Sequence, residues 1–293
     1  MDFLAQQILN GVMIGSTYAL IAIGFTLIFG ILNVLNMSQT EMVTWGAFIG
    51  YVLFTYLGLT SLPLIFVITV VSMGLIGLII ERLVIRPTSN PFRETEMLTP
   101  LIATIGAGMA LQNLALRIFE PKGLPYPLSI GKGGFDISGI YVAKSKLLGF
   151  LISIGIMCLL MGILYRTNLG KKMRATAEDP RAAIFLGVNI YAIYAIAMGI
   201  SSALGAVGGI LLSSIYGIIS PFVGMEYGLK GLIVMIIGGV TSLSGAVVGG
   251  LLLGVLETLT IGYISSAYVD AIAFGILILI LIIRPQGLLA SFK

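Results

Sequence analysis

Long apolar runs alternate with short polar segments along almost the whole chain. A helix needs roughly 20 residues to cross the hydrocarbon core of a bilayer. Several runs are shorter than this or are interrupted by glycine and proline, so the pattern predicts about eight or nine transmembrane or half-membrane helices. The runs fall at about residues 8–30, 37–57, 62–80, 97–119, 147–165, 191–214, 220–240, 246–263 and 267–283.

The pattern also predicts the fold class. Unpaired backbone groups are too costly in lipid, so a spanning segment is either a helix or part of a closed barrel. The sequence does not show the alternation of about ten residues that barrel strands require. We therefore expect an all-α integral membrane protein, a polytopic bundle that forms one transmembrane domain over residues 1–293.

The composition supports membrane insertion. Of the 293 residues, 58% are hydrophobic and 10% are charged, whereas a soluble domain carries about 25% charged residues. The chain has 38 glycines, and small residues allow transmembrane helices to approach closely. Several glycines recur four residues apart and predict such contacts: Gly11 and Gly15, Gly205 and Gly209, Gly245 and Gly249, and Gly250 and Gly254.

Three polar segments carry most of the positive charge. Residues 81–96, 166–189 and 284–293 hold three, five and two of the 16 lysines and arginines. An even number of predicted crossings separates these segments, so they lie on one side, and the positive-inside rule makes that side the cytoplasm. Three crossings precede the first segment. We therefore expect the N-terminus outside and the C-terminus in the cytoplasm.

A polar stretch, NVLNMSQTE, lies between two of the most apolar runs. Polar side chains at membrane depth face a cavity, a polar partner, or backbone groups that are freed where a helix breaks. One interpretation is that the stretch lines a translocation path. The other is a buried polar network that joins helices, and the two are compatible. The candidate path residues are Asn33, Asn36, Ser38, Gln39 and Glu41.

A second polar stretch, SPFVGMEYGLKGL, occupies residues 220–232. Glu226 and Lys230 are four residues apart, which predicts an ion pair along one helix face. Such a pair is either structural or part of the path. Ser220-Pro221 is typical of a broken or re-entrant helix, and Glu257, in a later run, is expected to pair across the bundle with a partner that the sequence does not identify.

Two short segments hint at an internal duplication. Phe29–Leu32 reads FGIL and Tyr216–Ile219 reads YGII, and each precedes one of the two polar stretches. A repeated unit of this kind predicts two similar groups of helices in the fold.

The polar segment 165–193, YRTNLGKKMRATAEDPRAAIFLGVNIYAI, predicts a short helix at the membrane surface. Glu178-Asp179-Pro180 is typical of a helix start, and Gly187 is typical of a helix end. Arginines and small residues on this helix would suit docking of another chain. A narrow apolar face is predicted from Met173, Ala177, Ile184 and Phe185.

This segment resembles the coupling loop of bacterial ABC importer permeases, specifically of the branched-chain amino acid permease family. Arg181–Gly187, RAAIFLG, is similar to the importer motif EAA-x-x-x-G, with arginine in place of glutamate. In Asn36–Glu41 the asparagine and the glutamate match the family's usual N-F-A-H-G-E, and the residues between them depart from it. Residues 15–36, 219–257 and 284–289 are also similar to that family, in the same order.

The resemblance implies a role and a set of partners. The chain would be one of two homologous permease subunits in the bacterial cytoplasmic (inner) membrane, working with two cytoplasmic ATP-binding subunits and an external solute-binding protein. It has no P-loop motif and no histidine, so we expect a non-enzyme without cofactor or metal, with ATP and Mg²⁺ bound by the partners. The implied ATPase-coupling residues are Arg174, Glu178, Arg181, Ala182, Ala183 and Gly187.

Several alternatives remain open at this point. The family handles leucine, isoleucine and valine, but close relatives carry urea or short amides. An ion-gradient secondary transporter or channel also has broken helices and polar residues at the midplane. Residues 120–146 are either an ordinary outer loop or a docking surface for an external partner. The net charge of +4 lies in loops and does not indicate nucleic-acid binding.

Overall fold

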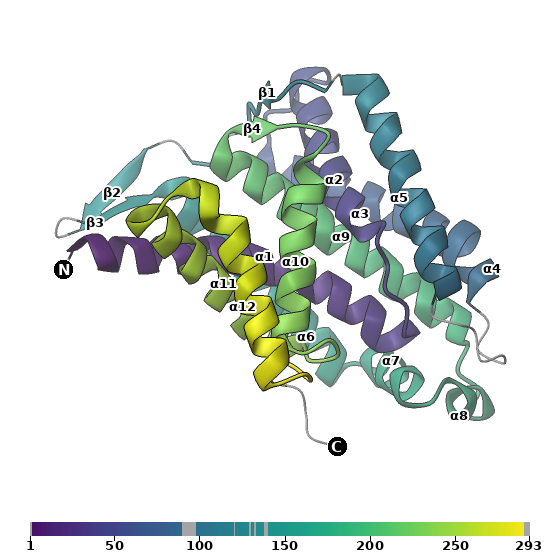
Figure 1. Ribbon diagram of the computed structural model, residues 1–293. Coiled ribbons are helices and arrows are strands. Elements are labelled where there is room, and N and C mark those ends of the chain that lie inside the picture. The colour runs from purple at the N-terminus through teal and green to yellow at the C-terminus, as the bar shows by residue number, and fades with distance from the viewer. Residues whose placement is uncertain are drawn as a thin grey trace.

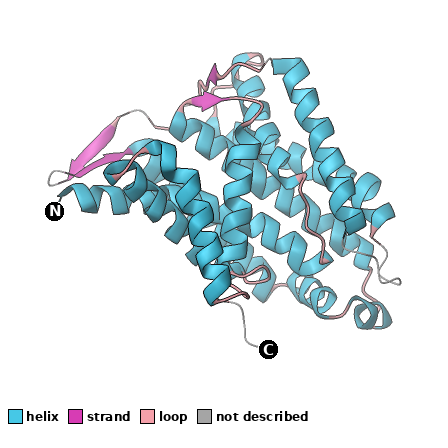
Figure 2. Cartoon of the chain, viewed as in Figure 1, coloured by secondary structure: helices cyan, strands magenta, loops and turns pink. Residues whose placement is uncertain are grey.

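A computed structural model describes residues 2–89, 98–119, 121–128, 130–131, 133–137 and 140–289. The predicted basic residues Arg93 and Lys293 lie outside the described residues. The described part is helical apart from short strands (Figures 1 and 2). The helices are α1 Asp2–Leu32, α2 Gln39–Thr55, α3 Leu62–Ile80 with its π-helical and α-helical extensions η1 Glu81–Ile85 and α4 Arg86–Thr88, α5 Leu98–Phe119, α6 Lys144–Arg166, α7 Asn168–Glu178, α8 Pro180–Phe185, α9 Ile190–Tyr216, α10 Val223–Gly238, α11 Leu243–Tyr263, η2 Ser266–Tyr268 and α12 Val269–Ile283.

The predicted all-α polytopic class is confirmed. Within the described residues, seven helices are long and apolar enough to cross a membrane: residues 3–32, 62–88, 98–119, 144–166, 190–216, 243–263 and 266–283. Two further helices, α2 with 17 residues and α10 with 16, are shorter than a full crossing. They begin within the two polar stretches, at Gln39 and Val223, as expected for half-membrane helices.

Helices α1 and α9 form the centre of the bundle (Figure 1). Helix α1 packs against α11, α9 and α10, while α9 packs against α2, α3 and α1. A lipid-facing helix keeps an exposed apolar side, but 89% of an 18-residue apolar stretch of α1 is buried by protein. The two helices that precede the polar stretches are therefore surrounded by the rest of the chain.

The helix contacts repeat in a way that supports the predicted duplication. One group is α1, α2 and α3, and the other is α9, α10 and α11. In each group a long helix is followed by a turn with a left-handed residue, then by a short helix and a third helix. The left-handed residues are Asn33, with φ of 53°, and Gly217, with φ of 72°. Helix α1 packs on α11 as α9 packs on α3, and α2 packs on α9 as α10 packs on α1. Exchanging α1–α2–α3 with α9–α10–α11 thus leaves the packing pattern unchanged.

Glycines allow the central helices to approach closely. A Cβ on Gly254 would overlap the backbone of Gly11 and Gly15 in α1, and one on Gly209 would overlap the carbonyl of Val43 in α2. A Cβ on Gly245 would overlap the backbone of α10. The predicted glycine-mediated helix contacts are confirmed.

The two ends of the bundle differ. At one end, β1 Leu124–Pro125 pairs with β4 Ile218–Ile219, and β2 Gly134–Ile137 pairs with β3 Ile140–Ala143, both antiparallel. Helices α4, α7 and α8 and the last described turn lie at the opposite end, which we call the α7/α8 end (Figure 1). There the guanidinium of Arg86 lies 4.4 Å from the ring centroid of Tyr191. The described parts of the three basic segments thus gather at one end, as predicted.

Candidate functional site

The first polar stretch is a true break between α1 and α2. Helix α1 ends at Leu32, and the chain then runs without helical structure from Asn33 to Ser38 before α2 begins at Gln39. The Oδ1 atom of Asn36 accepts hydrogen bonds from the backbone N–H and the hydroxyl of Ser38, at 3.1 and 2.7 Å. Non-helical backbone at membrane depth requires such internal partners.

Neighbouring helices hold this break in place. The backbone N–H of Met37 donates to Thr104 of α5 at 3.2 Å. The side-chain amide of Gln39 donates to the Ser201 carbonyl of α9 at 2.8 Å, and the Ser201 hydroxyl donates to the Gly24 carbonyl of α1 at 2.7 Å. These bonds form the predicted polar network, which joins α1, α2, α5 and α9.

The predicted path residues of this stretch do not all lie together. Asn36, Ser38, Gln39 and Glu41 are buried beside one another, whereas Asn33 is exposed at the end of α1. Asn33 occupies the left-handed turn that ends the helix. The structure therefore separates Asn33 from the other four.

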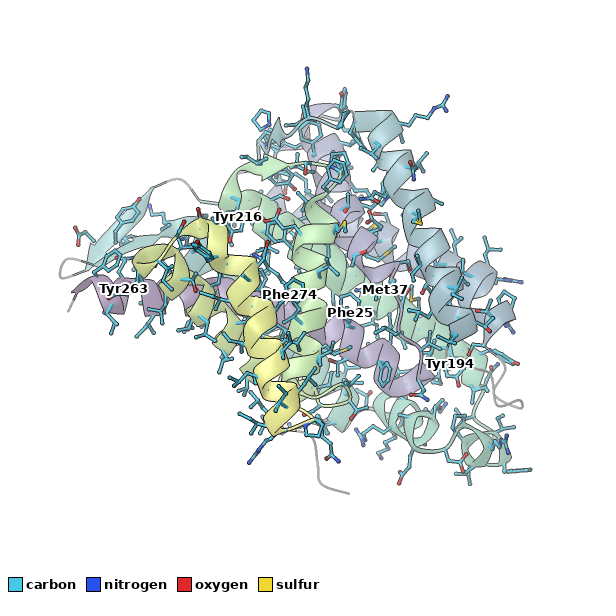
Figure 3. All side chains as sticks on the ribbon, viewed as in Figure 1. Phe25, Met37, Tyr194, Tyr216, Tyr263 and Phe274 are labelled. Atoms are coloured by element: carbon cyan, nitrogen blue, oxygen red, sulfur yellow. The ribbon has the colours of Figure 1, made fainter. Side chains whose placement is uncertain are left out.

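A groove of about 220 Å³ opens between α2, α5 and α10. Figure 3 shows Met37 in the gap between α10 and α5. Glu41 lies in this groove with 4% of its surface exposed. Its Oε2 atom has no hydrogen-bond partner among the described residues.

The half-helices α2 and α10 meet near their first turns. The backbone N–H of Gly224 donates to the hydroxyl of Thr44 at 3.0 Å, and a Cβ on Gly228 would contact Thr40. Both helices therefore begin beside the groove. Helix N-termini carry partial positive charge, so this region is polar even where its side chains are not.

The predicted pair of Glu226 with Lys230 is wrong. The Nζ of Lys230 lies 2.7 Å from Oε1 of Glu257 in α11, and both side chains are 7% exposed. Glu226 is exposed instead. Spacing along α10 permits either partner, but the lysine points into the bundle, where only an internal carboxylate can neutralise it. Glu257, for which the sequence identified no partner, supplies that carboxylate.

Aromatic rings surround this ion pair. The Nζ of Lys230 lies 5.5 Å from the ring centroid of Tyr18 and 5.8 Å from that of Tyr227. Tyr216 stacks on Tyr227 with centroids 5.5 Å apart. The faces of these rings stabilise a cation. The cluster joins α1, α9, α10 and α11 and was not predicted as a unit, because its members are far apart in the sequence.

The segment predicted as one surface helix is two helices, α7 and α8. Asp179 separates them with extended backbone, and its side chain accepts hydrogen bonds from the N–H groups of Arg181 and Ala182 at 2.8 and 3.1 Å. It is the N-cap of α8, so the predicted start is confirmed. Gly187 follows α8 with φ of 78°, as predicted for a helix end.

The cap of α8 leads to a testable expectation. Asp179→Ala removes both hydrogen bonds and should cost about 1 kcal/mol of local stability. Amide hydrogen exchange over 181–186 should become about fivefold faster. Glu178→Ala is the matched control, because Glu178 ends α7 and caps nothing in α8. Equal exchange in both variants would contradict the capping role.

The predicted coupling residues divide into two groups. Arg181, Ala182 and Gly187 are exposed on or just after α8, whereas Ala183 is buried against the bundle. Arg174 and Glu178 instead line a cavity of about 460 Å³ between α1, α6, α7 and the α10–α11 turn.

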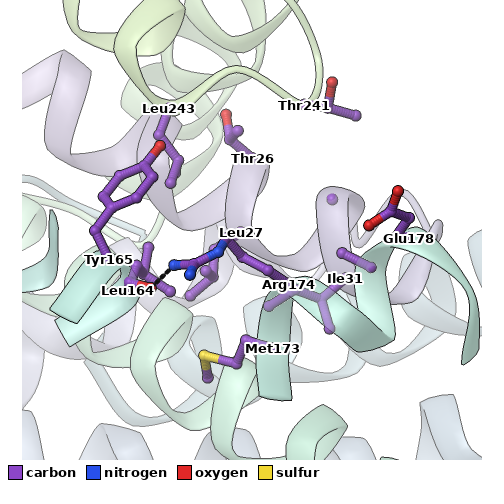
Figure 4. Close-up of a pocket in the computed structure, with 12 residues that line it drawn as sticks. Thr26, Leu27, Ile31, Leu164, Tyr165, Met173, Arg174, Glu178, Thr241 and Leu243 are labelled. Atoms are coloured by element: carbon purple, nitrogen blue, oxygen red, sulfur yellow. Dashed lines mark hydrogen bonds between the residues drawn. The ribbon is translucent and has the colours of Figure 1, made fainter. Parts of the chain in front are cut away.

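Arg174 is held within this cavity. Figure 4 shows its guanidinium donating to the backbone carbonyl of Leu164. The same group lies 5.3 Å from the ring centroid of Tyr165. Part of the hydrogen-bonding capacity of Arg174 is thus used inside the subunit, although Arg174, like Arg181, is exposed.

Two apolar side chains at the end of α8 are exposed to an extent that the sequence did not predict. Phe185 is 91% exposed and Leu186 is 78% exposed. The sequence placed Phe185 on one apolar face with Met173, but Met173 is 1% exposed and belongs to the core. The break at Asp179 rotates α8 relative to α7, so the two residues do not share a face. The sequence signal for this exposure was the pair of large apolar residues directly before Gly187, which ends the helix.

The described residues contain no group of three or more His, Cys, Asp or Glu side chains that could hold a metal ion.

Comparison with known proteins matches nearly the whole chain. Residues 7–281 match the family model described as branched-chain amino acid transport system / permease component. The permease protein BraD of the high-affinity branched-chain amino acid transport system of Pseudomonas aeruginosa is 36% identical, over 97% of this chain and 95% of the relative.

Two further relatives carry the same system name. Permease protein LivH of Escherichia coli is 33% identical, over 98% of this chain and 96% of the relative. Permease protein LivM of Salmonella typhimurium is 26% identical, over 93% of this chain and 67% of the relative. No solved structure matches.

Proposed function

The chain belongs to the family of branched-chain amino acid transport system permease components, and from this premise we propose that it forms the translocation path of an ABC importer for branched-chain amino acids. The observation that carries the proposal is the match over nearly the full length to permeases named for that transport. The two broken helices and the polar groove between them support it.

The importer has several chains. A second permease subunit related to this one pairs with it, and the similarity to LivM supports such a pairing of related permeases. Two ATP-binding subunits hydrolyse ATP with Mg²⁺, and an external solute-binding protein delivers the substrate. This chain holds no cofactor and catalyses no reaction itself.

The membrane is the bacterial cytoplasmic (inner) membrane, and the α7/α8 end faces the cytoplasm. The gathering of η1, α4, α7 and α8, which carry arginines and lysines, at this end supports that orientation. The N-terminus is then outside, and the described parts of 120–146, with β1, β2 and β3, face the binding protein.

The packing of α7 and α8 supports a route for coupling. Helix α8 contacts the start of α9, and α7 contacts α1, α6 and α9. When the ATP-binding subunits close, they move α8, and the contacts pass this motion to the two helices that precede the breaks. Rigid helices then shift about their interfaces and open the path on the other side.

Reconstitution tests the proposed function. Proteoliposomes that hold both permeases and both ATP-binding subunits should accumulate leucine, isoleucine and valine when ATP and the binding protein are present. Accumulation by this chain alone, without ATP, would instead establish an ion-gradient transporter or a channel. Uptake of urea or acetamide in place of leucine would assign the amide branch of the family.

The exposed surface of α8 leads to a second expectation. Arg181→Glu should abolish leucine uptake while the assembled complex still hydrolyses ATP, because the charge that meets the ATP-binding subunit is reversed. Gly187→Trp should do the same, although its left-handed backbone makes this variant less specific. Lys171→Glu, a charge reversal on exposed α7, is the control. Normal uptake in both test variants would remove α8 from the coupling route.

A further inference from the structure

We propose that the groove between α2, α5 and α10 is the substrate site within the membrane, and that Glu41 binds the α-ammonium group of a zwitterionic amino acid there. This inference rests on the proposed function and deepens it. It assigns a chemical class to the substrate and a recognition role to one residue.

The first observation is the unsatisfied carboxylate. Glu41 is 96% buried, with 4% of its surface exposed. Its Oε2 atom has no hydrogen-bond donor among the described residues, and no described lysine or arginine forms an ion pair with it. A buried carboxylate without a cation costs several kcal/mol, roughly, so such groups are retained where something else neutralises them.

Another buried carboxylate of the bundle, Glu257, has a cation beside it. Lys230 and Glu257 neutralise each other at 2.7 Å, deep between α10 and α11. The neighbours of Glu41 in the break also find partners, since Asn36 bonds Ser38 and Gln39 bonds the Ser201 carbonyl. Oε1 of Gln39 and Oε1 of the buried Glu81 also lack hydrogen-bond partners among the described residues, but Glu81 lies near Arg82 and Arg86. Of these three residues, Glu41 is the one that lines the groove.

The second observation is the shape and lining of that cavity. The groove holds about 220 Å³, and its walls come from Ile105 and Met109 of α5 and from Met225 and Leu229 of α10. Flexible methionine side chains adapt to apolar groups of different shape. Such walls suit the side chains of leucine, isoleucine and valine alike.

The groove also offers a polar group for the other end of a zwitterion. Gln112 of α5 lines the same groove as Glu41, and its amide supplies two N–H donors for a carboxylate. A carboxylate that can bind a cation, an N–H donor and apolar walls in one groove match an amino acid with a branched side chain. They do not match urea or a short amide, which carries no charge for Glu41.

The position of the groove is consistent with a path rather than a lipid contact. Met109 and Met225 are 60% and 54% exposed on its rim, and Glu41 forms part of its lining. Lipid chains would leave the carboxylate in hydrocarbon. A water-filled path at the interface with the second permease subunit avoids that cost and gives the substrate access.

The test uses cysteine protection in the complete importer in nanodiscs, without the binding protein. Met109→Cys in a Cys158→Ser background places one thiol on the groove wall. Leucine should slow its modification by a water-soluble methanethiosulfonate, whereas 4-methylpentanoate, which keeps the carboxylate and the branched chain but lacks the ammonium, should not. The native Cys158 lies on α6, away from the groove, and its replacement leaves the M109C thiol as the one cysteine of this chain.

Adding Glu41→Gln should raise the leucine concentration for half protection by about 10- to 100-fold, the effect of losing one charge-assisted hydrogen bond. Asp270→Asn, the same change at an exposed site on α12, should leave it unchanged. Glutamine is uncharged, like a protonated Glu41. Unaltered protection in Glu41→Gln would therefore show that leucine does not need a negative charge there, and it would overturn the proposal. Equal protection by 4-methylpentanoate would do so as well.

The remaining outcomes separate this inference from the proposed function. If the importer accumulates leucine with ATP but leucine never protects the M109C thiol, the groove is not the site and the transport function stands. If Glu41 instead pairs with the second subunit, Glu41→Gln weakens assembly of the two permeases and leaves protection intact. If no leucine accumulates at all, the proposed function itself fails.

Discussion

Lys230→Met is expected to destabilise the subunit by about 3–5 kcal/mol, because it leaves the Glu257 carboxylate buried without its cation. The two groups are 2.7 Å apart and 7% exposed, so water cannot replace the lysine. The rings of Tyr18 and Tyr227 would then face a lone negative charge, which their negative faces disfavour. Unfolding of the purified chain in detergent with increasing denaturant would measure the loss.

Two companion variants make this expectation specific. Lys230→Met with Glu257→Leu removes both charges and should recover most of the lost stability, since an apolar pair of similar size is often as stable as a buried ion pair. Glu226→Gln should change stability by less than about 0.5 kcal/mol, because Glu226 is exposed. If Glu226→Gln were as damaging as Lys230→Met, the lysine would have its partner on α10 after all.

Gly209→Leu is expected to disrupt the contact between α9 and α2. Even a single Cβ at this position would overlap the Val43 carbonyl, which belongs to the helix backbone and cannot move aside as a side chain can. Overpacking of this kind costs about 1–3 kcal/mol and sometimes more. Thermal unfolding of the detergent-solubilised protein, followed by size-exclusion chromatography, would measure the effect.

The chain offers a matched control for this substitution. Gly155 lies within α6, and a Cβ there would meet nothing within 4 Å. Gly155→Leu should therefore be tolerated, and on helix propensity alone it should be slightly favourable. Val43→Ala should not rescue Gly209→Leu, because the obstacle is the carbonyl of residue 43. Rescue by that change would show that the side chain, and not the backbone, sets the distance between the helices.

The two destabilising variants test different parts of one architecture. Gly209 lies where α9 crosses α2, and Lys230 lies where α10 faces α11. The first contact holds α2 against the central helix α9, and the second holds α10 against α11. The groove with Glu41 lies between the short helices, so its shape depends on both contacts. We expect transport to be lost in both variants together with stability.

Much of the fold could be predicted from local features of the sequence. The length of an apolar run decides whether it can cross a bilayer, and the run itself contains that information. The start of α8 at Asp179 and its end before Gly187 follow from capping, which depends on residues within one turn. The shared end of the basic segments follows from counting crossings.

The site could be predicted only in part. The sequence identified Asn36, Ser38, Gln39 and Glu41 as polar residues within apolar surroundings, but it could not say which would find partners. Gln39 bonds α9, more than 160 residues away in the sequence. The Oε2 atom of Glu41 lacks such a partner among the described residues. Whether a polar group is satisfied depends on what the tertiary fold brings to it.

By itself, the sequence determined that this protein lies in a membrane, which segments break its helices, and which segments share one end. These properties depend on the energy of placing a residue in lipid or at a helix end, and that energy is local. The tertiary structure alone decided that Lys230 binds Glu257 and not Glu226, and that Phe185 points outward while Met173 is buried. Spacing along a helix permits several partners, and only the packing of other helices around it removes water from one face and so selects among them.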